Sequence, residues 1–89
     1  MKTILFYWSR GAETRRDIIM LAAECGKKEK PCYLSTLAKR LKLSHVAIKK
    51  HVDLLLEEGY MKVTNPGGKP AFLALTGKGR EVFNEISEK

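Results

Sequence analysis

Apolar residues recur every three or four positions in two short blocks between residues 34 and 59. This spacing places the apolar side chains of each block on one side of an α-helix. The two stripes are Leu37, Ala38 and Leu41, followed by Ile48, Val52 and Leu55. A serine precedes each block, Ser35 and Ser44, and serine side chains cap helix N-termini. Only Leu43 is left for the turn, so the pattern predicts a helix-turn-helix over residues 35–58.

The segments on either side predict a helix before this pair and a hairpin after it. Residues 12–25 repeat their apolar positions at helical spacing, and Gly26 is a typical C-terminal stop. Gly59 ends the second helix of the pair in the same way. Residues 60–64 and 71–75 have strand-like sequences, and the Asn-Pro-Gly-Gly-Lys-Pro run between them is a strong turn signal.

Three further segments complete the prediction. Residues 1–10 form an N-terminal arm or strand, because Thr-Ile-Leu-Phe-Tyr-Trp within them is β-branched and aromatic. Residues 32–34 can form a short strand. Thr76 caps a final helix over residues 76–89.

The element order and the size of the chain define the fold class. Its 89 residues suffice for a single domain, 1–89, with a modest core, and a hydrophobic fraction of 44% is that of a globular protein. We therefore predict an α+β fold that is mainly α. It is a winged helix-turn-helix with a two- to three-stranded antiparallel β-wing over residues 60–75.

Positive charge is concentrated in the predicted helix-turn-helix. The chain carries 17 Lys and Arg against 10 Asp and Glu, a net charge of +7. Residues 27–51 hold eight of the basic residues and one acid, Glu29, so this segment alone accounts for +7 and the rest is neutral. A polyanion, most simply nucleic acid, is the partner that this distribution indicates.

The remaining chemistry-bearing residues form no recognisable site. Paired carboxylates, a nucleophile beside a base, and metal-ligand spacing are all missing from the sequence, so we expect neither an enzyme nor a cofactor. Cys25 and Cys32 lack the C-x-x-C spacing, and His45 and His51 fall on different faces of one helix. We therefore expect no bound metal. Buried thiols are the simpler interpretation of the cysteines, and a thiol switch is the alternative.

The hydropathy of the chain argues against a membrane protein. No apolar run approaches the roughly 18 residues that span a bilayer. The short apolar run near the N-terminus is not followed by a small-residue cleavage site. We expect a cytoplasmic protein that does not associate with membranes.

The helix-turn-helix and the run after the wing resemble the winged-helix domain of MarR-like and ArsR-like transcriptional regulators of bacteria and archaea. The matching runs are LSTLAKRLKLSHVAIKKHVDLLLEEGYMKV and LALTGKG, and the resemblance covers residues 12–80. It implies a DNA-binding regulator of transcription. One position departs from the family: Lys42 stands in the turn where a glycine is usual. A left-handed backbone there would cost a lysine about 1–2 kcal/mol.

The resemblance implies which side chains face DNA. The second helix of the pair, residues 44–58, would enter the major groove of double-stranded DNA, where a lysine can donate to guanine and a valine can touch a thymine methyl. The first helix of the pair would hold backbone phosphates, and the wing would contact phosphates or the minor groove. The expected contacts are Ser35, Thr36, Lys39, Arg40, Ser44, His45, Val46, Lys49, Lys50, Lys62 and Lys69. His51, near the core edge, is expected to be structural.

Two further possibilities concern partners. Leu54 lies off the core stripe, and Phe6, Tyr7 and Trp8 add aromatic surface, which favours a homodimer through the arm, the first helix and the last helix. An arm folded back onto its own domain is the alternative. A winged-helix module that binds RNA or another protein in a larger assembly is the alternative to a DNA-binding regulator.

Overall fold

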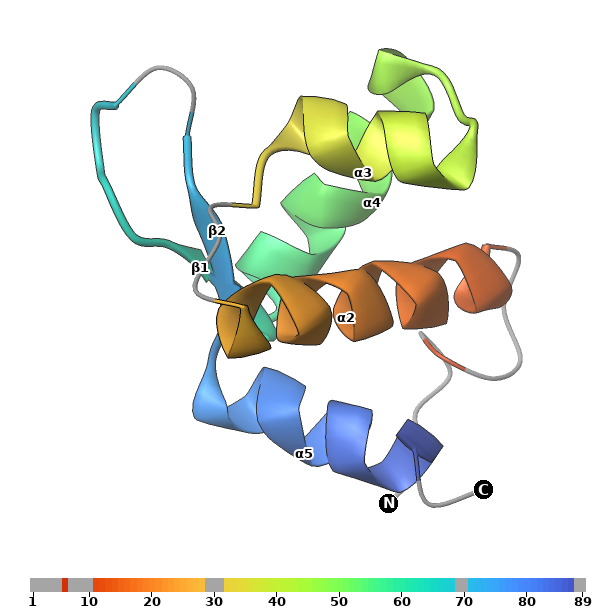
Figure 1. Cartoon of the computed structure of the whole chain (residues 1–89), viewed down its shortest axis with the longest axis vertical. Coiled ribbons are helices and arrows are strands. Elements are labelled where there is room, and N and C mark those ends of the chain that lie inside the picture. Colours follow the sequence, from red (N-terminus) through yellow and green to blue (C-terminus); the bar gives the residue numbers. More distant parts are fainter. Residues whose placement is uncertain (1–5, 7–10, 29–31, 69–70, 88–89) are drawn as a thin grey trace.

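The elements follow one another in the predicted order. A computed structural model describes residues 6, 11–28, 32–68 and 71–87. Its helices and strands are α2 (Ala12–Lys27), α3 (Leu34–Leu41), α4 (His45–Glu57), β1 (Met61–Val63), β2 (Leu73–Leu75) and α5 (Gly77–Ser87). Helix α2 runs through the middle of the molecule, between α3 and α4 on one side and α5 on the other, and the wing projects beside α3 and α4 (Figure 1).

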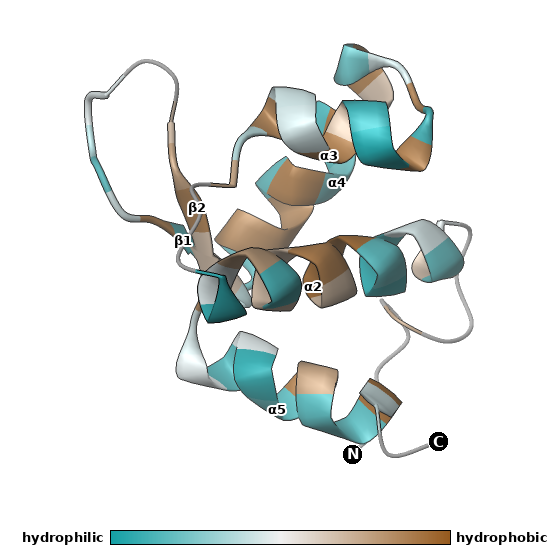
Figure 2. Cartoon of the chain, viewed as in Figure 1, coloured by the Kyte–Doolittle hydropathy of each residue, from teal (hydrophilic) through white to brown (hydrophobic). Residues whose placement is uncertain are grey.

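The predicted apolar stripes form the core. Leu37 of α3 and Ile48, Val52 and Leu55 of α4 are each at most 1% exposed. Ile18 and Ile19, from the middle of α2, complete the centre, and both are fully buried. Figure 2 shows the corresponding hydrophobic segments where α2, α4 and the wing strands approach one another. Burial of these side chains is the main favourable term that holds the helix-turn-helix on α2.

The wing is a two-stranded antiparallel sheet. Met61 pairs with Leu75 and Val63 with Leu73. The predicted third strand at residues 32–34 is reduced to one bond, in which the Leu73 N–H donates to the Cys32 carbonyl at 2.8 Å. Leu34 already belongs to α3, so the two-stranded form of the prediction is the one that is confirmed.

Two helix ends differ from their predictions. Helix α3 begins at Leu34 after an extended Tyr33, so Ser35 lies inside its first turn and does not cap it. Helix α2 passes through Gly26 and ends at Lys27, because a glycine costs a helix only about 1 kcal/mol. The Ser44 cap is confirmed, since its hydroxyl accepts from the Ala47 N–H at 3.1 Å.

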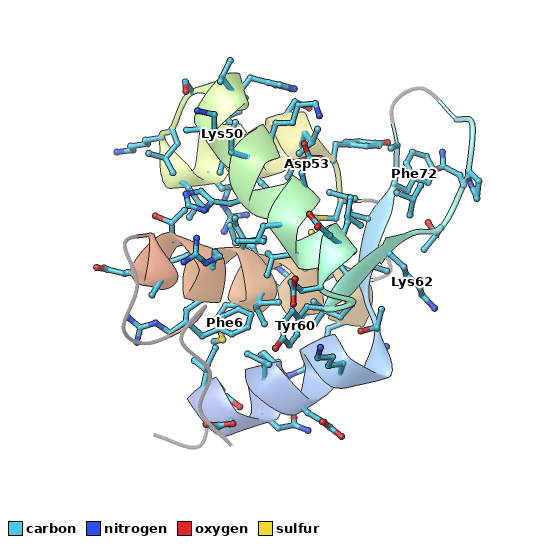
Figure 3. All side chains as sticks on the ribbon, turned by 180° about the vertical axis from the view of Figure 1, so that it is seen from behind. Phe6, Lys50, Asp53, Tyr60, Lys62 and Phe72 are labelled. Atoms are coloured by element: carbon cyan, nitrogen blue, oxygen red, sulfur yellow. The ribbon has the colours of Figure 1, made fainter. Side chains whose placement is uncertain are left out.

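Within the predicted N-terminal arm, the described residue is Phe6; the other nine positions of 1–10 lie outside the described residues. Phe6 has helical backbone conformation and is 1% exposed. Its ring meets the Tyr60 ring edge-on, with the centroids 5.0 Å apart and the planes at 87° (Figure 3). This arrangement is a favoured aromatic geometry, and it places Phe6 in the core of its own domain.

The LALTGKG run joins the start of α5 to the end of α4. The Thr76 hydroxyl donates to the Gly59 carbonyl at 2.6 Å and accepts from the Gly79 N–H at 3.1 Å. Lys78 donates to the Glu58 carbonyl at 2.8 Å, which satisfies a carbonyl at the helix end. The same ammonium lies 4.4 Å from the centre of the Tyr60 ring. The threonine, the lysine and the second glycine of the run therefore each have a structural role.

The turn between α3 and α4 places Lys42 in the left-handed region, with φ 58° and ψ 41°. The Leu43 N–H donates to the Ala38 carbonyl at 3.0 Å, and the Lys42 N–H donates to the Lys39 carbonyl at 3.4 Å. These two bonds form a Schellman motif, which is usually completed by glycine. The lysine is therefore strained at the position where the chain departs from the family pattern.

A Cβ at residue 79 would stand 2.1 Å from the Tyr60 carbonyl oxygen, so Gly79→Ala must push α5 away from the end of α4. We expect a loss of about 2–4 kcal/mol in the free energy of unfolding, measured by urea denaturation. Gly77→Ala is the matched control, because nothing lies within 4 Å of a Cβ there. Equal stability of the two variants would contradict this account of the junction.

Lys42→Gly should stabilise the fold by about 1 kcal/mol, because glycine adopts positive φ without steric strain but loses more backbone entropy on folding. Lys42→Ala removes the same charge and keeps the Cβ, so it should bring no such gain. Thermal unfolding of the two variants beside the parent chain measures the difference. A similar gain from both substitutions would mean that charge repulsion, and not backbone strain, sets the cost of Lys42.

Candidate nucleic-acid interface

The predicted reading face of α4 is exposed. Ser44, His45, Val46, Lys49 and Lys50 all lie at the surface. This happens because the opposite stripe of α4 is buried in the core, so the first two turns of the helix present their polar side to solvent. Figure 3 shows α4 at the front of the molecule, with Lys50 and Asp53 on it and the wing beside it.

The two lysines of this face differ in their surroundings. The Lys49 ammonium lies 2.8 Å from the Asp53 carboxylate, and these side chains are 58% and 57% exposed. An exposed pair one helical turn apart contributes only about 0.3–0.5 kcal/mol, so Lys49 can leave it readily for a phosphate or a base. Lys50 makes no ion pair within the described part of the chain. It is the more available cation of the two.

Val46 carries an unusual exposure for an apolar side chain. It is 67% exposed, against 38% for Leu43 and 37% for Met20, the other exposed large hydrophobic residues among those described. A single exposed valine is common on protein surfaces. Here it lies beside the lysines on the first turn of a capped helix, where an apolar contact with a thymine methyl is chemically reasonable.

Helix α3 contributes a second basic surface. Lys39 and Arg40 are exposed, and the Arg40 guanidinium lies 3.9 Å from the Glu24 carboxylate, which also meets Lys28 at 3.2 Å. In the first turn of α3, Ser35 is exposed and Thr36 is half-buried. The structure thus brings these residues next to α4, on the element that packs directly against it.

The wing residues are less closely associated with this face. Lys62 is exposed on β1, at the base of the wing and beyond the C-terminal end of α4 (Figure 3). The first turns of α4, with Lys49 and Lys50, lie at the other end of the helix. Lys69 lies outside the described residues. The wing tip is held by Asn65, whose side-chain oxygen accepts from the Phe72 N–H at 2.6 Å.

A partly buried pair that the sequence did not reveal joins α4 to α2. Arg15 of α2 is 5% exposed, and its Nη1 lies 3.2 Å from Nδ1 of His51. Burial and then the Arg15 charge lower the pKa of His51, so its neutral form is favoured, and neutral Nδ1 can accept this bond. His51 is therefore structural, as expected. The sequence did contain a signal for the burial of Arg15. This residue lies three positions before Ile18 and four before Ile19, so it falls on the apolar side of α2.

The described residues hold neither a metal-ligand cluster nor a membrane span. Over 6, 11–28, 32–68 and 71–87, no group of three or more His, Cys, Asp or Glu side chains is placed to hold a metal ion. None of the helices within these ranges combines the length and the hydropathy of a membrane span.

Comparison with solved structures finds proteins of similar fold. No family model matches the chain, and no curated protein matches it. A single-site mutant of Lactococcus lactis ZitR superposes with a TM-score of 0.71 at 26% identity, over 85% of this chain and 50% of that one. Wild-type ZitR in complex with DNA gives a TM-score of 0.70 at 26% identity, over 84% of this chain and 49% of that one.

The adhesin competence repressor AdcR from Streptococcus pyogenes shares the fold, with a TM-score of 0.71 at 21% identity over 84% of this chain and 54% of that one. ZitR is a zinc-responsive member of the MarR family. The chain spans about half the length of these proteins. Its fold is the winged helix-turn-helix of MarR-like regulators, as the sequence resemblance implied.

The burial of His51, and then its contact with Arg15, makes stability depend on pH. The pKa of His51 is lower in the folded state than in the unfolded state, so the unfolded chain binds more protons below about pH 6.5. Stability should therefore fall as the pH drops from 7.5 to 5, measured by urea denaturation at each pH. His51→Gln should flatten this dependence. The exposed His45→Gln is the matched control, and equal changes in both variants would exclude the burial of His51 and its contact with Arg15 as the cause of the pH dependence.

Proposed function

We propose that this chain is a sequence-specific double-stranded DNA-binding domain of a transcriptional regulator. Helix α4 would lie in the major groove and the wing along the flanking backbone or minor groove. The observation that carries the proposal is the exposed basic face of the capped helix α4. That face carries two lysines and an exposed valine. The ion pair between Lys49 and Asp53 on it is exposed to solvent and therefore weak.

Base contacts come from the first turns of α4. Lys50, and Lys49 once released from Asp53, can donate to guanine O6 and N7, and Val46 can pack on a thymine methyl. Ser44 and His45, at the leading end of the helix, are within the region that approaches bases or phosphates in helix-turn-helix proteins. The α4 register supports this role, because its buried stripe fixes which residues remain outside.

Phosphate contacts come from α3 and the wing. Lys39 and Arg40 offer exposed cations beside α4, and Ser35 with Thr36 lies at the N-terminal turn of α3, where backbone N–H groups favour anions. Lys62 and Lys69 would supply charge from the wing. The similar structure of ZitR in complex with DNA supports the use of such a fold for duplex binding.

We further propose that the chain works as a homodimer, through its N-terminal segment, α2 and α5. Of the side chains that suggested dimerisation, Phe6 is buried in its own core, and Leu54 is half-buried without being one of the hydrophobic residues that pack against that core. Support comes instead from Met20, an exposed apolar side chain on α2. A two-fold dimer would present two copies of α4 to a palindromic site.

Replacing both Lys49 and Lys50 by alanine should weaken duplex binding by about 10- to 100-fold and lower the slope of log affinity against log salt by about 1–2, because contacts to phosphates or bases are lost. Fluorescence anisotropy with genomic duplexes and with RNA of the same sequence measures this. Asp53→Asn should raise affinity, since it removes an acid from the same face.

Arg80→Ala, on α5, removes one positive charge away from this face, and it should change affinity less than twofold. Unfolding temperatures confirm that each variant is folded. If the double variant binds DNA as the parent does, α4 is not the reading helix. Equal affinity of the parent chain for RNA and DNA would favour an RNA-binding module instead.

A further inference from the structure

The turn between α3 and α4 contains an exposed lysine that the interface proposed above does not use. Lys42 follows α3 with a left-handed backbone, and among the described residues it alone combines a side chain with a positive φ. Glycine adopts this conformation without a steric cost, whereas a residue with a Cβ is strained there. A lysine therefore stands where glycine would complete the same helix end more stably.

The surroundings of Lys42 in the free domain do not offset this strain. Within the described part of the chain, its ammonium makes no ion pair. A cation at the C-terminal end of a helix is favoured by the helix dipole, but at an exposed position that effect is smaller than the strain. Lys39 and Arg40 lie close before it, so three cations fall within four residues. Their mutual repulsion adds to the cost of the lysine.

The position of the turn places this charge beside the proposed reading face. Every residue from 42 to 46 is exposed, so the turn and the leading end of α4 form one continuous surface. The turn precedes the N-terminal end of α4, whereas the wing follows its C-terminal end. Figure 1 shows the turn and the wing on opposite sides of the helix-turn-helix. Lys42 and the wing therefore flank α4 at its two ends.

We propose that Lys42 binds a phosphate of the DNA backbone at the edge of the major groove, beside the leading end of α4. The inference rests on the proposed function and adds a contact residue to it. Phosphate contacts fix the position and orientation of a protein on the duplex but carry no direct sequence information. With one such contact from the wing and one from Lys42, α4 is held in the groove from both ends.

This contact gives the backbone strain a functional reason. Strained residues cluster at binding sites, where the contact that they make offsets the stability that they cost. A phosphate neutralises the Lys42 charge and relieves its repulsion with Lys39 and Arg40, which happens only when the polyanion is bound. The same lysine therefore lowers the stability of the free domain and raises its affinity for DNA. A lysine that is merely solvated would lower stability without raising affinity.

The test compares Lys42→Gly, Lys42→Ala and Lys42→Arg with the parent chain. Fluorescence anisotropy at several salt concentrations uses two labelled probes, a duplex that the parent chain selects from a random-sequence pool and the same duplex with its bases scrambled. The glycine and alanine variants should each bind both probes about 3- to 10-fold more weakly and lower the slope of log affinity against log salt by about 1. Lys42→Arg keeps the charge and should stay within about twofold of the parent.

Lys42→Gly separates the contact from the fold, because it should unfold at a higher temperature than the parent and yet bind DNA more weakly. Lys27→Ala is the matched control. Lys27 is also an exposed lysine at the C-terminal end of a helix, but it lies among the residues that line a cavity between α2, β2 and α5. Its loss should change the affinity for either probe by less than about twofold.

The outcomes separate a failure of this contact from a failure of the proposed function. If Lys42→Ala binds as the parent does while the double variant of Lys49 and Lys50 is weakened, the turn does not touch DNA and the reading helix stands. A loss confined to the selected duplex would assign Lys42 to a base and overturn the phosphate contact. An equal loss in Lys27→Ala would reveal a general effect of net charge and overturn it too. A parent chain that binds no duplex overturns both proposals.

Discussion

The close approach of α5 to the end of α4 is the constraint on which the arrangement of this domain depends. Helix α4 must end where the wing begins, and the carbonyls that directly follow its last turn need partners. Thr76 and Lys78 supply two of them, at the Gly59 and Glu58 carbonyls. Gly79 allows the backbones to meet, since any side chain there would strike the Tyr60 carbonyl. This junction fixes how the end of α4 meets α5, and the buried stripe of α4 then decides which side of that helix faces outward.

The proposed reading face is a consequence of this packing. Ile48, Val52 and Leu55 are buried against α2, so the lysines of α4 remain in solvent, where the described ion pair is weak. The Arg15–His51 contact joins the same helix to α2 through polar atoms inside the domain. Such a contact is costly unless it is satisfied, and it therefore defines one register of α4 on α2 more strictly than apolar packing does. The contact needs the neutral form of His51, so the packing of α4 on α2 depends on pH.

Much of the fold and of the site was predictable from local patterns. The α4 stripe, the Ser44 cap, the turn glycine at 59 and the hairpin signal all act over a few residues, so sequence spacing is enough to identify them. Helix ends were harder to place. Ser35 has the chemistry of a cap, but α3 begins one residue earlier and the serine lies within its first turn. Gly26 has the chemistry of a stop, but α2 continues through it at modest cost.

The sequence by itself determined the winged helix-turn-helix, the exposed face of α4 and the location of the excess positive charge, because period, capping and charge are properties of neighbouring residues. The tertiary structure alone decided which distant groups meet. It paired Arg15 with His51, set Phe6 against Tyr60, and left a cavity between α2, the second wing strand and α5. It also put Lys42 in a left-handed turn. These outcomes depend on how the helices pack across the core, which no local pattern encodes.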